Sequence, residues 1–585
     1  MKGMSGAETL LRVLRSMGVE CIFASPGSDW APLWEALAGP YRDGEIPRYI
    51  SSRHEETAIG MAAGYAKSTG KLPAVVLHTT VGALHATMAL RAALHERTPM
   101  VVLAGESIGF AQPPAMDPGR QWLRVLADVG GPARLVEQCV KWCLAVNTPL
   151  IMASSVARAC QLAMASPRGP TFLSIPTEML QETMPADPPS ASALPQPGAC
   201  DPQALEELAA ALAAAKNPLI VTEELGKNQA AVAHLVALAE TLGAPVVEAW
   251  QPYYVNFPRA HPLYGGIAAS EMPALVGAAD LVLLVDAVAP WHPPATLPAR
   301  GTKVAVVGED PLHARLPVWN YRTDMILSGD AGTALAALAA RVRQLVPAGS
   351  RGASFERWRA AHEARRRALR EEGTAAGQKS AIESRWVGRE LAAVLPPRAI
   401  VVDETITHRL EVQQALDGLE PGQFYEGSYG GLGLGMPTAL GVKAAHPGRT
   451  VVFLVGDGAF HYNPVVASLG AAQEHHLPML VIVFNNAGYL SQKRDVVHEY
   501  PEGFAVRTQR FAGTSIAPRP DYALLARAYG GYGERVEEPR GVRAALARGL
   551  EAVAGGRLAL IDVVLAAVNP QDLAGQPDAE RPGIS

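Results

Sequence analysis

The chain has 585 residues, of which 49% are hydrophobic and 18% charged, so it can build several buried cores and is not expected to be disordered. Its formal net charge of −5 argues against nucleic acid and anionic membranes as partners. Five cysteines are too few for a disulfide scaffold, and no apolar run approaches the roughly 18 residues of a membrane helix. The first residues mix charged and apolar side chains as an amphipathic helix does, rather than forming a signal peptide. We therefore expect a soluble cytoplasmic protein.

Short apolar runs alternate with Ala- and Leu-rich helical patterns along the chain. This alternation is typical of parallel sheets whose strands are buried on both faces, and it predicts an α/β fold. The strand-like runs are Leu72–Leu77, Met100–Leu103, Pro218–Val221, Leu281–Val285, Val304–Val307, Ala399–Val402, Val451–Val455 and Met479–Phe484.

Two segments that lack this alternation divide the chain. Residues 186–200 are rich in Pro, Ser and Ala, and residues 346–382 pass from a Gly-containing turn into a strongly charged helical stretch. Because Glu alternates with Arg in that stretch, a solvated linker helix is favoured over a nucleic-acid-binding segment. The sequence thus predicts three doubly wound parallel-sheet domains, at residues 1–185, 201–345 and 383–585.

The strongest chemical signal lies in the third predicted domain, where two strand-like runs end on small or oxygen-bearing residues. Ligands of parallel sheets bind beyond the carboxyl ends of the strands, so these residues are expected at one site. An Asp and an Asn offer hard oxygen ligands to Mg²⁺, and glycines let the backbone approach an anion at a helix N-terminus. The residues at the two strand ends are Gly456, Asp457, Gly458, Ala459, Asn485 and Asn486.

This pattern resembles the signature of the thiamine-diphosphate-dependent enzymes, which runs from an apolar-plus-small pair through a Pro to Gly-Asp-Gly. The matching positions are Leu440, Gly441, Pro447, Val452, Leu454, Gly456, Asp457, Gly458 and Ala459. The resemblance implies thiamine diphosphate and Mg²⁺ as cofactors, with the metal held by Asp457, Asn486 and the backbone carbonyl of Gly488. The spacing from Asp457 to Asn485 is slightly longer than is usual in the family.

Three further residues of this domain match cofactor-binding positions of the same family. Thr407 would anchor the diphosphate, and the carbonyl of Gly430 would accept a hydrogen bond from the exocyclic amine of the cofactor. Leu432 would hold the cofactor bent. The resemblance makes this the diphosphate-binding domain, residues 201–345 the middle domain and residues 1–185 the pyrimidine-binding domain.

The first predicted domain contains a candidate for the acid that activates this cofactor. His54-Glu55, followed by Gly64-Tyr65-Ala66, resembles the activating-glutamate segment of the family, and its register selects Glu55 rather than Glu56. A desolvated carboxyl there can share a proton with the aminopyrimidine ring and so promote loss of the proton at the reactive thiazolium carbon. The resemblance implies that two chains share each site, hence at least a homodimer and usually a homotetramer.

Ser28, His78 and His292 narrow the choice of branch within the family. Taken singly, Ser28 can be a helix cap, His78 a structural residue at a strand end, and His292 part of a surface loop. Together they resemble the benzoylformate decarboxylase branch. That branch uses a Ser in a Pro-Gly-Ser turn to hold the substrate carboxylate and two histidines to move protons.

We therefore predict a thiamine-diphosphate-dependent 2-oxo-acid decarboxylase or carboligase, a carbon–carbon lyase or transferase. It would release CO₂ and form an aldehyde or, with an aldehyde or ketone acceptor, a 2-hydroxy ketone.

Two alternatives remain open. One is an enzyme like acetolactate synthase or pyruvate oxidase, with FAD in the middle domain. Residues 221–226 lack a G-x-G-x-x-G run, so FAD is not favoured. The other is a cofactor-binding regulatory protein without catalysis, against which the intact set of cofactor residues counts.

Overall fold

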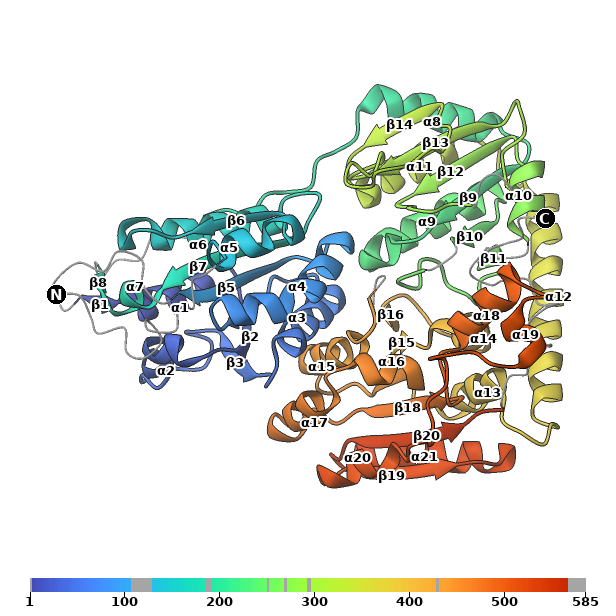
Figure 1. The fold of residues 1–585 in the computed structure, drawn as a ribbon. Coiled ribbons are helices and arrows are strands. Elements are labelled where there is room, and N and C mark those ends of the chain that lie inside the picture. Colours follow the sequence, from blue (N-terminus) through green and yellow to red (C-terminus); the bar gives the residue numbers. More distant parts are fainter. Residues whose placement is uncertain are drawn as a thin grey trace. The chain divides into compact units, whose positions relative to one another are not determined.

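The computed structural model describes residues 3–106, 129–184, 192–249, 252–267, 271–291, 296–427 and 431–566. One compact unit contains Met1–Gln196, Gly427–Val451 and His461–Met479, and a second contains Pro197–Glu426, Val452–Phe460 and Leu480–Ser585. The described strands form three six-stranded parallel sheets and one short antiparallel pair (Figure 1). The predicted α/β class with three parallel-sheet domains is confirmed. The predicted domain limits stay predictions, although each sheet lies within one of the three predicted ranges.

The first sheet lies in the first unit and has the strand order β3-β2-β4-β5-β7-β6. In that order its strands are Arg48–Ser51, Cys21–Ser25, Ala74–Leu77, Met100–Glu106, Pro170–Pro176 and Trp142–Ala145. Its helices are α1 (Gly6–Ser16), α2 (Ala31–Leu37), α3 (Glu55–Thr69), α4 (Thr80–His95), α5 (Gly131–Val136), α6 (Pro149–Met164) and α7 (Thr177–Gln181). The short strands β1 (Met4–Ser5) and β8 (Thr183–Met184) pair antiparallel beside it.

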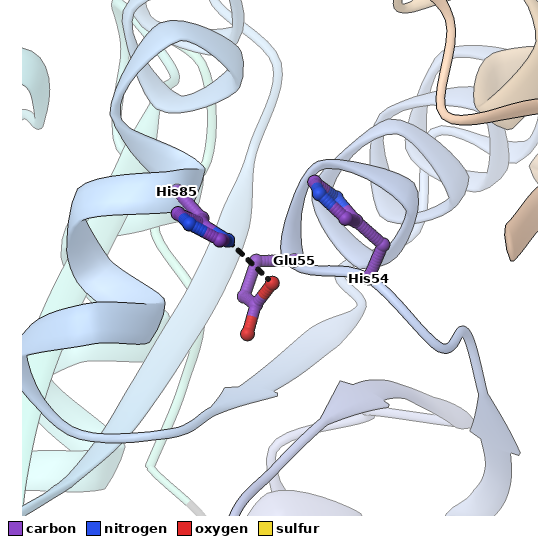
Figure 2. A group of neighbouring side chains, drawn as sticks. All are labelled: His54, Glu55 and His85. Atoms are coloured by element: carbon purple, nitrogen blue, oxygen red, sulfur yellow. Dashed lines mark hydrogen bonds and ion pairs between the residues drawn. The ribbon is translucent and has the colours of Figure 1, made fainter.

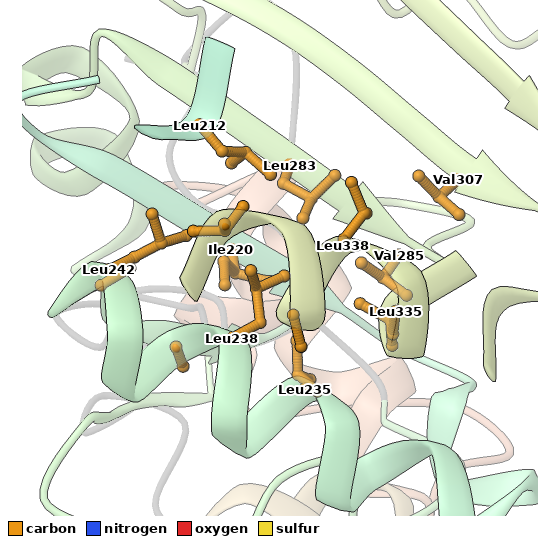
Figure 3. Packing of buried hydrophobic residues seen from close by; sticks show 14 of the residues in the cluster. Leu212, Ile220, Leu235, Leu238, Leu242, Leu283, Val285, Val307, Leu335 and Leu338 are labelled. Carbon is orange, nitrogen blue, oxygen red and sulfur yellow. The ribbon is translucent and has the colours of Figure 1, made fainter. Parts of the chain in front are cut away.

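The second sheet has the order β11-β10-β9-β12-β13-β14, and its two faces are both covered by apolar residues. Along β12 (Leu281–Val285), Leu281, Leu283 and Val285 join one core, while Val282 and Leu284 join the core on the other face. Figure 3 shows the first of these cores, where leucines of α9 (Gln229–Leu242) and α11 (Ala331–Leu345) pack on the strands. This two-sided burial explains why the strand is a continuous apolar run rather than an alternating one.

The strands of this sheet are Tyr264–Ile267, Val246–Glu248, Pro218–Thr222, Leu281–Val285, Lys303–Gly308 and Met325–Ser328 in the same order. Its helices are α8 (Pro202–Ala214), α9 (Gln229–Leu242), α10 (Met272–Ala278) and α11 (Ala331–Leu345).

The expected charged linker is helix α12 (Gly352–Ala376), which is largely exposed. Arg359 pairs with Glu356 and Glu363 along its surface, the spacing at which opposite charges stabilise a helix. None of the described helices is both long and apolar enough to cross a membrane.

The third sheet has the order β16-β15-β17-β18-β20-β19. In that order its strands are Phe424–Glu426, Ile400–Glu404, Val451–Gly456, Leu480–Asn485, Ala559–Val564 and Tyr532–Val536. The helices that follow or precede these strands are α13 (Ser384–Val394), α14 (Arg409–Ala415), α16 (Asp457–Tyr462), α18 (Leu490–Glu499), α19 (Phe504–Thr508), α20 (Ala523–Ala528) and α21 (Val542–Ala554).

Helices α15 (Gly435–Ala445) and α17 (Val465–Glu474) belong to the first unit, where α15 packs closely on α3. A Cβ atom at Gly441 would lie 1.9 Å from the carbonyl oxygen of Met61, and one at Gly64 would lie 2.0 Å from that of Thr438. Only glycine leaves room for backbones this close. The apolar-plus-small pair of the sequence signature therefore has a packing role in the structure.

Candidate active site

The expected metal ligands of the third sheet lie at one edge, beyond the carboxyl ends of β17 and β18. These strands are neighbours, with Gly456 in register with Phe484. Asp457 is 1% exposed, and its Oδ1 and Oδ2 accept hydrogen bonds from the backbone N–H groups of Gly458 (2.9 Å) and Gly488 (3.2 Å). The Gly488 N–H also donates to Oδ1 of Asn486 at 3.0 Å. The fold thus brings Asp457, Asn486 and Gly488 together.

Burial raises the pKa of the Asp457 carboxyl to about 6, although the surrounding backbone N–H groups favour its ionised form. A cation bound there would stabilise that ionised form. The donor set of a carboxylate, an amide oxygen and a backbone carbonyl consists of hard oxygens, which is the chemistry that Mg²⁺ prefers. The residues present therefore fit the expected Mg²⁺.

His408 orients the second expected ligand, and sequence reasoning missed it. The side-chain amide of Asn486 donates to Nε2 of His408 at 3.2 Å, which leaves the amide oxygen as the acceptor of the Gly488 N–H. Burial, assisted by the charge of Arg494, lowers the pKa of His408 to about 4 and keeps its ring neutral and able to accept. The one sequence signal for His408 is its position directly after Thr407, the residue expected to bind the diphosphate.

Two glycines and one strained residue shape the backbone at the ends of β15 and β17, where the diphosphate is expected. A Cβ atom at Gly456 would meet only the carbonyl of Thr405, at 3.7 Å, whereas one at Gly458 would lie 2.8 Å from the ring of Tyr489. The residue before Thr407, Ile406, has φ of +49°, a strained value for a β-branched side chain. That backbone turn presents the half-buried Thr407 just after β15.

Of four other residues expected at the cofactor or substrate, the structure describes two. Ala459 is buried in α16, next to the glycine turn. Leu432 is half-buried in the loop before α15. Gly430 and His292 lie outside the described residues, so their expected roles stay predictions.

Glu55 is the first residue of α3 and lies next to two imidazole rings (Figure 2). Its Oε2 is 3.3 Å from Nδ1 of His85 on α4, and the rings of His54 and His85 stack with centroids 5.5 Å apart. His54 caps the helix, because its Nδ1 accepts from the N–H of Glu56. The Glu55 side chain is 16% exposed, so it is largely desolvated yet reachable. Sequence reasoning missed His85.

Ser28 and His78 lie in adjacent loops at the carboxyl end of the first sheet. The backbone N–H of His78 donates to the carbonyl of Ser25 at 3.2 Å, which joins the loops after β2 and β4. Ser28 is exposed at the start of a short 3₁₀ turn, η1 (Ser28–Trp30). Both His78 and Glu55 lie close to Gly82, since a Cβ there would lie 3.4 Å from the first side chain and 3.6 Å from the second. The fold therefore groups His78 with Glu55.

The ring of His78 has a partner that the sequence did not reveal. Its Nδ1 lies 2.6 Å from Oδ1 of Asp29, which is 2% exposed. This hydrogen bond raises the pKa of His78 against the opposing effect of burial, and the charges of Asp29 and Glu55 act in the same upward direction. The half-buried imidazole is suited to proton transfer.

Models of one protein family match this chain in three stretches. The N-terminal TPP binding domain of thiamine pyrophosphate enzymes matches residues 4–110, the central domain residues 205–338, and the C-terminal TPP binding domain residues 407–563. The chain belongs to the thiamine pyrophosphate enzyme family. Thiamine pyrophosphate is another name for thiamine diphosphate, so the family predicted from the motifs is confirmed.

Named relatives place this thiamine pyrophosphate enzyme with the decarboxylases and acetolactate synthases. A benzoylformate decarboxylase from Pseudomonas aeruginosa is 29% identical over 532 residues, covering 88% of this chain and 91% of that protein. The large subunit of acetolactate synthase isozyme 2 from Escherichia coli is 26% identical over 557 residues, 93% of each chain. A solved 4-hydroxybenzoylformate decarboxylase from Rhodococcus jostii has a TM-score of 0.79 at 25% identity, covering 97% of this chain and 100% of that one.

Proposed function

We propose that the protein is a thiamine-diphosphate- and Mg²⁺-dependent 2-oxo-acid decarboxylase of the benzoylformate decarboxylase type. The observation that carries this proposal is the Asp29-supported imidazole of His78 beside Glu55. Release of an aldehyde requires a proton at the carbon from which CO₂ has left, and His78 is a group that can supply it. Transfer to a second carbonyl compound has no such requirement at that carbon.

The cofactor residues fit this reaction. When bound, thiamine diphosphate supplies a nucleophilic carbon that adds to the keto group and accepts the electron pair left by CO₂. Asp457, Asn486 and the carbonyl of Gly488 would hold Mg²⁺ against the diphosphate. Thr407 and the glycines of the Gly-Asp-Gly turn would bind the diphosphate itself, and Leu432 and the Gly430 carbonyl would hold the rest of the cofactor.

Four further residues would activate the cofactor, bind the substrate and transfer protons. Glu55 would exchange a proton with the aminopyrimidine ring, and Ser28 would hold the carboxylate of the 2-oxo acid through its hydroxyl. His78 would deliver the proton that releases the aldehyde, with His292 of the middle domain as a second proton carrier.

We further propose that two chains share each site within a homotetramer. Light scattering of the purified protein measures this oligomeric state directly.

A panel of 2-oxo acids, aromatic and aliphatic, tests the proposal with added thiamine diphosphate and Mg²⁺. CO₂ release and an aldehyde product are expected from at least one member. CO₂ release from none, with the cofactor shown to be bound, would contradict it.

The acetolactate synthase relative supports carboligation as the second candidate activity. The same panel, run with an added aldehyde or ketone acceptor, distinguishes the two. A 2-hydroxy ketone as the main product, formed by a protein with the absorption spectrum of a bound flavin, would favour the synthase type over the decarboxylase.

A further inference from the structure

Asp29 and His78 form a pair that is enclosed by the fold. The Asp29 side chain has no exposed surface, while that of His78 is 22% exposed. Two further hydrogen bonds tie the same two loops together: the N–H of His78 donates to the Ser25 carbonyl, and Nε1 of Trp30 donates to the Leu77 carbonyl at 2.8 Å. The pair is therefore rigidly held rather than formed by two mobile side chains.

Two glycines make the space for this pair. A Cβ atom at Gly27 would lie 2.1 Å from Nδ1 of His78, and one at Gly105 would lie 1.6 Å from Oδ2 of Asp29. Neither glycine has a positive φ, so any residue could adopt its backbone conformation. What glycine provides at both positions is room for the carboxylate and the ring.

His78 is the main counter-charge available to Asp29. Oδ2 of Asp29 is buried and has no hydrogen-bond partner among the described residues, and Oδ1 contacts the imidazole. A buried carboxylate is costly unless it is paired, so the ring is held with a proton on Nδ1. The other titratable group that acts on His78 is Glu55 of α3, also acidic, which favours the cationic ring as well.

We propose that Asp29 is a positioning residue that fixes the His78 ring through Nδ1 and leaves Nε2 to exchange the proton of the reaction. This inference rests on the proposed role of His78. In the step itself the Nε2–H bond breaks, the proton forms a C–H bond at the carbon that lost CO₂, and the imidazole becomes neutral. It regains a proton from water before the next turnover.

The test compares Asp29→Asn with His78→Ala and with the double variant, in the full-length enzyme loaded with thiamine diphosphate and Mg²⁺. Asp29→Asn preserves the shape of the side chain. We expect kcat to fall about 10–100-fold at neutral pH with a smaller change in KM. The limb of the kcat–pH profile on which activity falls with rising pH should move to lower pH, because the neutral amide no longer favours the imidazolium. In the His78→Ala background, Asp29→Asn should add little.

Asp43→Asn serves as the matched control, because Asp43 is exposed in a loop of the same domain and the change removes the same charge. It should leave kcat and its pH profile unchanged. A shift equal to that of Asp29→Asn would overturn the inference, since it would reflect net charge rather than contact.

Two outcomes separate this inference from the proposed function. If Asp29→Asn keeps the parental kcat and pH profile while His78→Ala is impaired, the inference fails and the role of His78 stands. If His78→Ala is as active as the parent, the proton-donor role fails and the inference fails with it.

NMR of the native enzyme provides a readout that needs no Asp29 variant. The native enzyme is labelled with ¹⁵N-histidine, and the His78 signals are those missing from the spectrum of the His78→Gln variant. Protonation of Nδ1 that persists above the pH at which an ordinary histidine titrates supports the inference, and ordinary titration overturns it.

Discussion

Two buried carboxylates, Asp29 and Asp457, occupy the same kind of position in two different sheets. Each lies just beyond the carboxyl end of a parallel strand, with exposed fractions of 2% and 1%. They differ in what faces them: Asp29 contacts the imidazole of His78, whereas Asp457 is held by the backbone N–H groups of Gly458 and Gly488. A titratable ring suits the first carboxylate to proton exchange, while neutral amides leave the second with a charge that a divalent cation can balance.

The largest effect is expected in the region around Asp29 and His78, where proton exchange is proposed. Glu55→Gln should lower kcat by about 10²–10⁴-fold, because the amide cannot exchange the proton that the cofactor ring needs. Cofactor binding and the unfolding temperature should change little. Steady-state kinetics measures kcat, calorimetric titration with thiamine diphosphate measures cofactor binding, and thermal unfolding measures the unfolding temperature. Glu56→Gln, one position along α3, is the matched control, and near-normal turnover of Glu55→Gln would refute the assignment.

The variant Asp457→Ala tests the proposed metal-binding region of the third sheet. Loss of the charged ligand should weaken binding of Mg²⁺ with thiamine diphosphate by at least about 100-fold, because the remaining donors are neutral oxygens. Calorimetric titration of the apoenzyme measures the change. Glu551→Gln removes an exposed charge from α21 and should bind both as the parent does. Unchanged affinity of Asp457→Ala would show that the two carboxylates do not differ as proposed.

The pairing of Asp29 with His78 also predicts a pH dependence of stability. The folded-state pKa of His78 is raised, so its contribution is fully present below the unfolded pKa of about 6.5 and is lost as pH rises through the folded value. Asp29→Asn should therefore destabilise most at low pH, by about 1.5–3 kcal/mol for a charge-assisted hydrogen bond. Denaturant unfolding at several pH values checks this. A destabilisation by Asp29→Asn that grows with rising pH would contradict the predicted direction of the pH dependence.

The smallest effects compare the glycines beside the two carboxylates. Gly105→Ala would drive a methyl group into a buried carboxylate and should destabilise by about 1–3 kcal/mol, whereas Gly458→Ala meets a ring that can shift and should cost less. Thermal unfolding ranks the two. Gly448→Ala is the control, because its Cβ would meet nothing within 4 Å. The reverse ranking would show that the space beside Asp29 is not restricted.

Much of the site was predictable because it is encoded locally. The Gly-Asp-Gly turn and the Asn pair each follow a strand that is recognisable as an apolar run, and parallel strands place their ends at one edge of the sheet. Glu55 was identified in the same way, from a short segment opening a helix. The roles assigned to these residues stay predictions that the variants above test.

The contacts that the sequence did not reveal join residues far apart in the chain. His78 and Asp29 are separated by 49 positions, His85 and Glu55 by 30, and Asn486 and His408 by 78. Each of these partners is an ordinary polar residue in its own segment, and no periodicity distinguishes it. Their pairing depends on which loops the strand order brings together.

The sequence by itself determined the α/β class, the family and which residue types follow each strand, because strand burial and turn chemistry are local properties of the chain. Only the tertiary structure decided what each buried charge faces. Asp29 meets a histidine because β2 and β4 are neighbours in the first sheet, and Asp457 meets backbone amides because the loop after β18 folds back on α16. Counter-charges are set by strand order and loop closure, which the apolar pattern of a single chain does not encode.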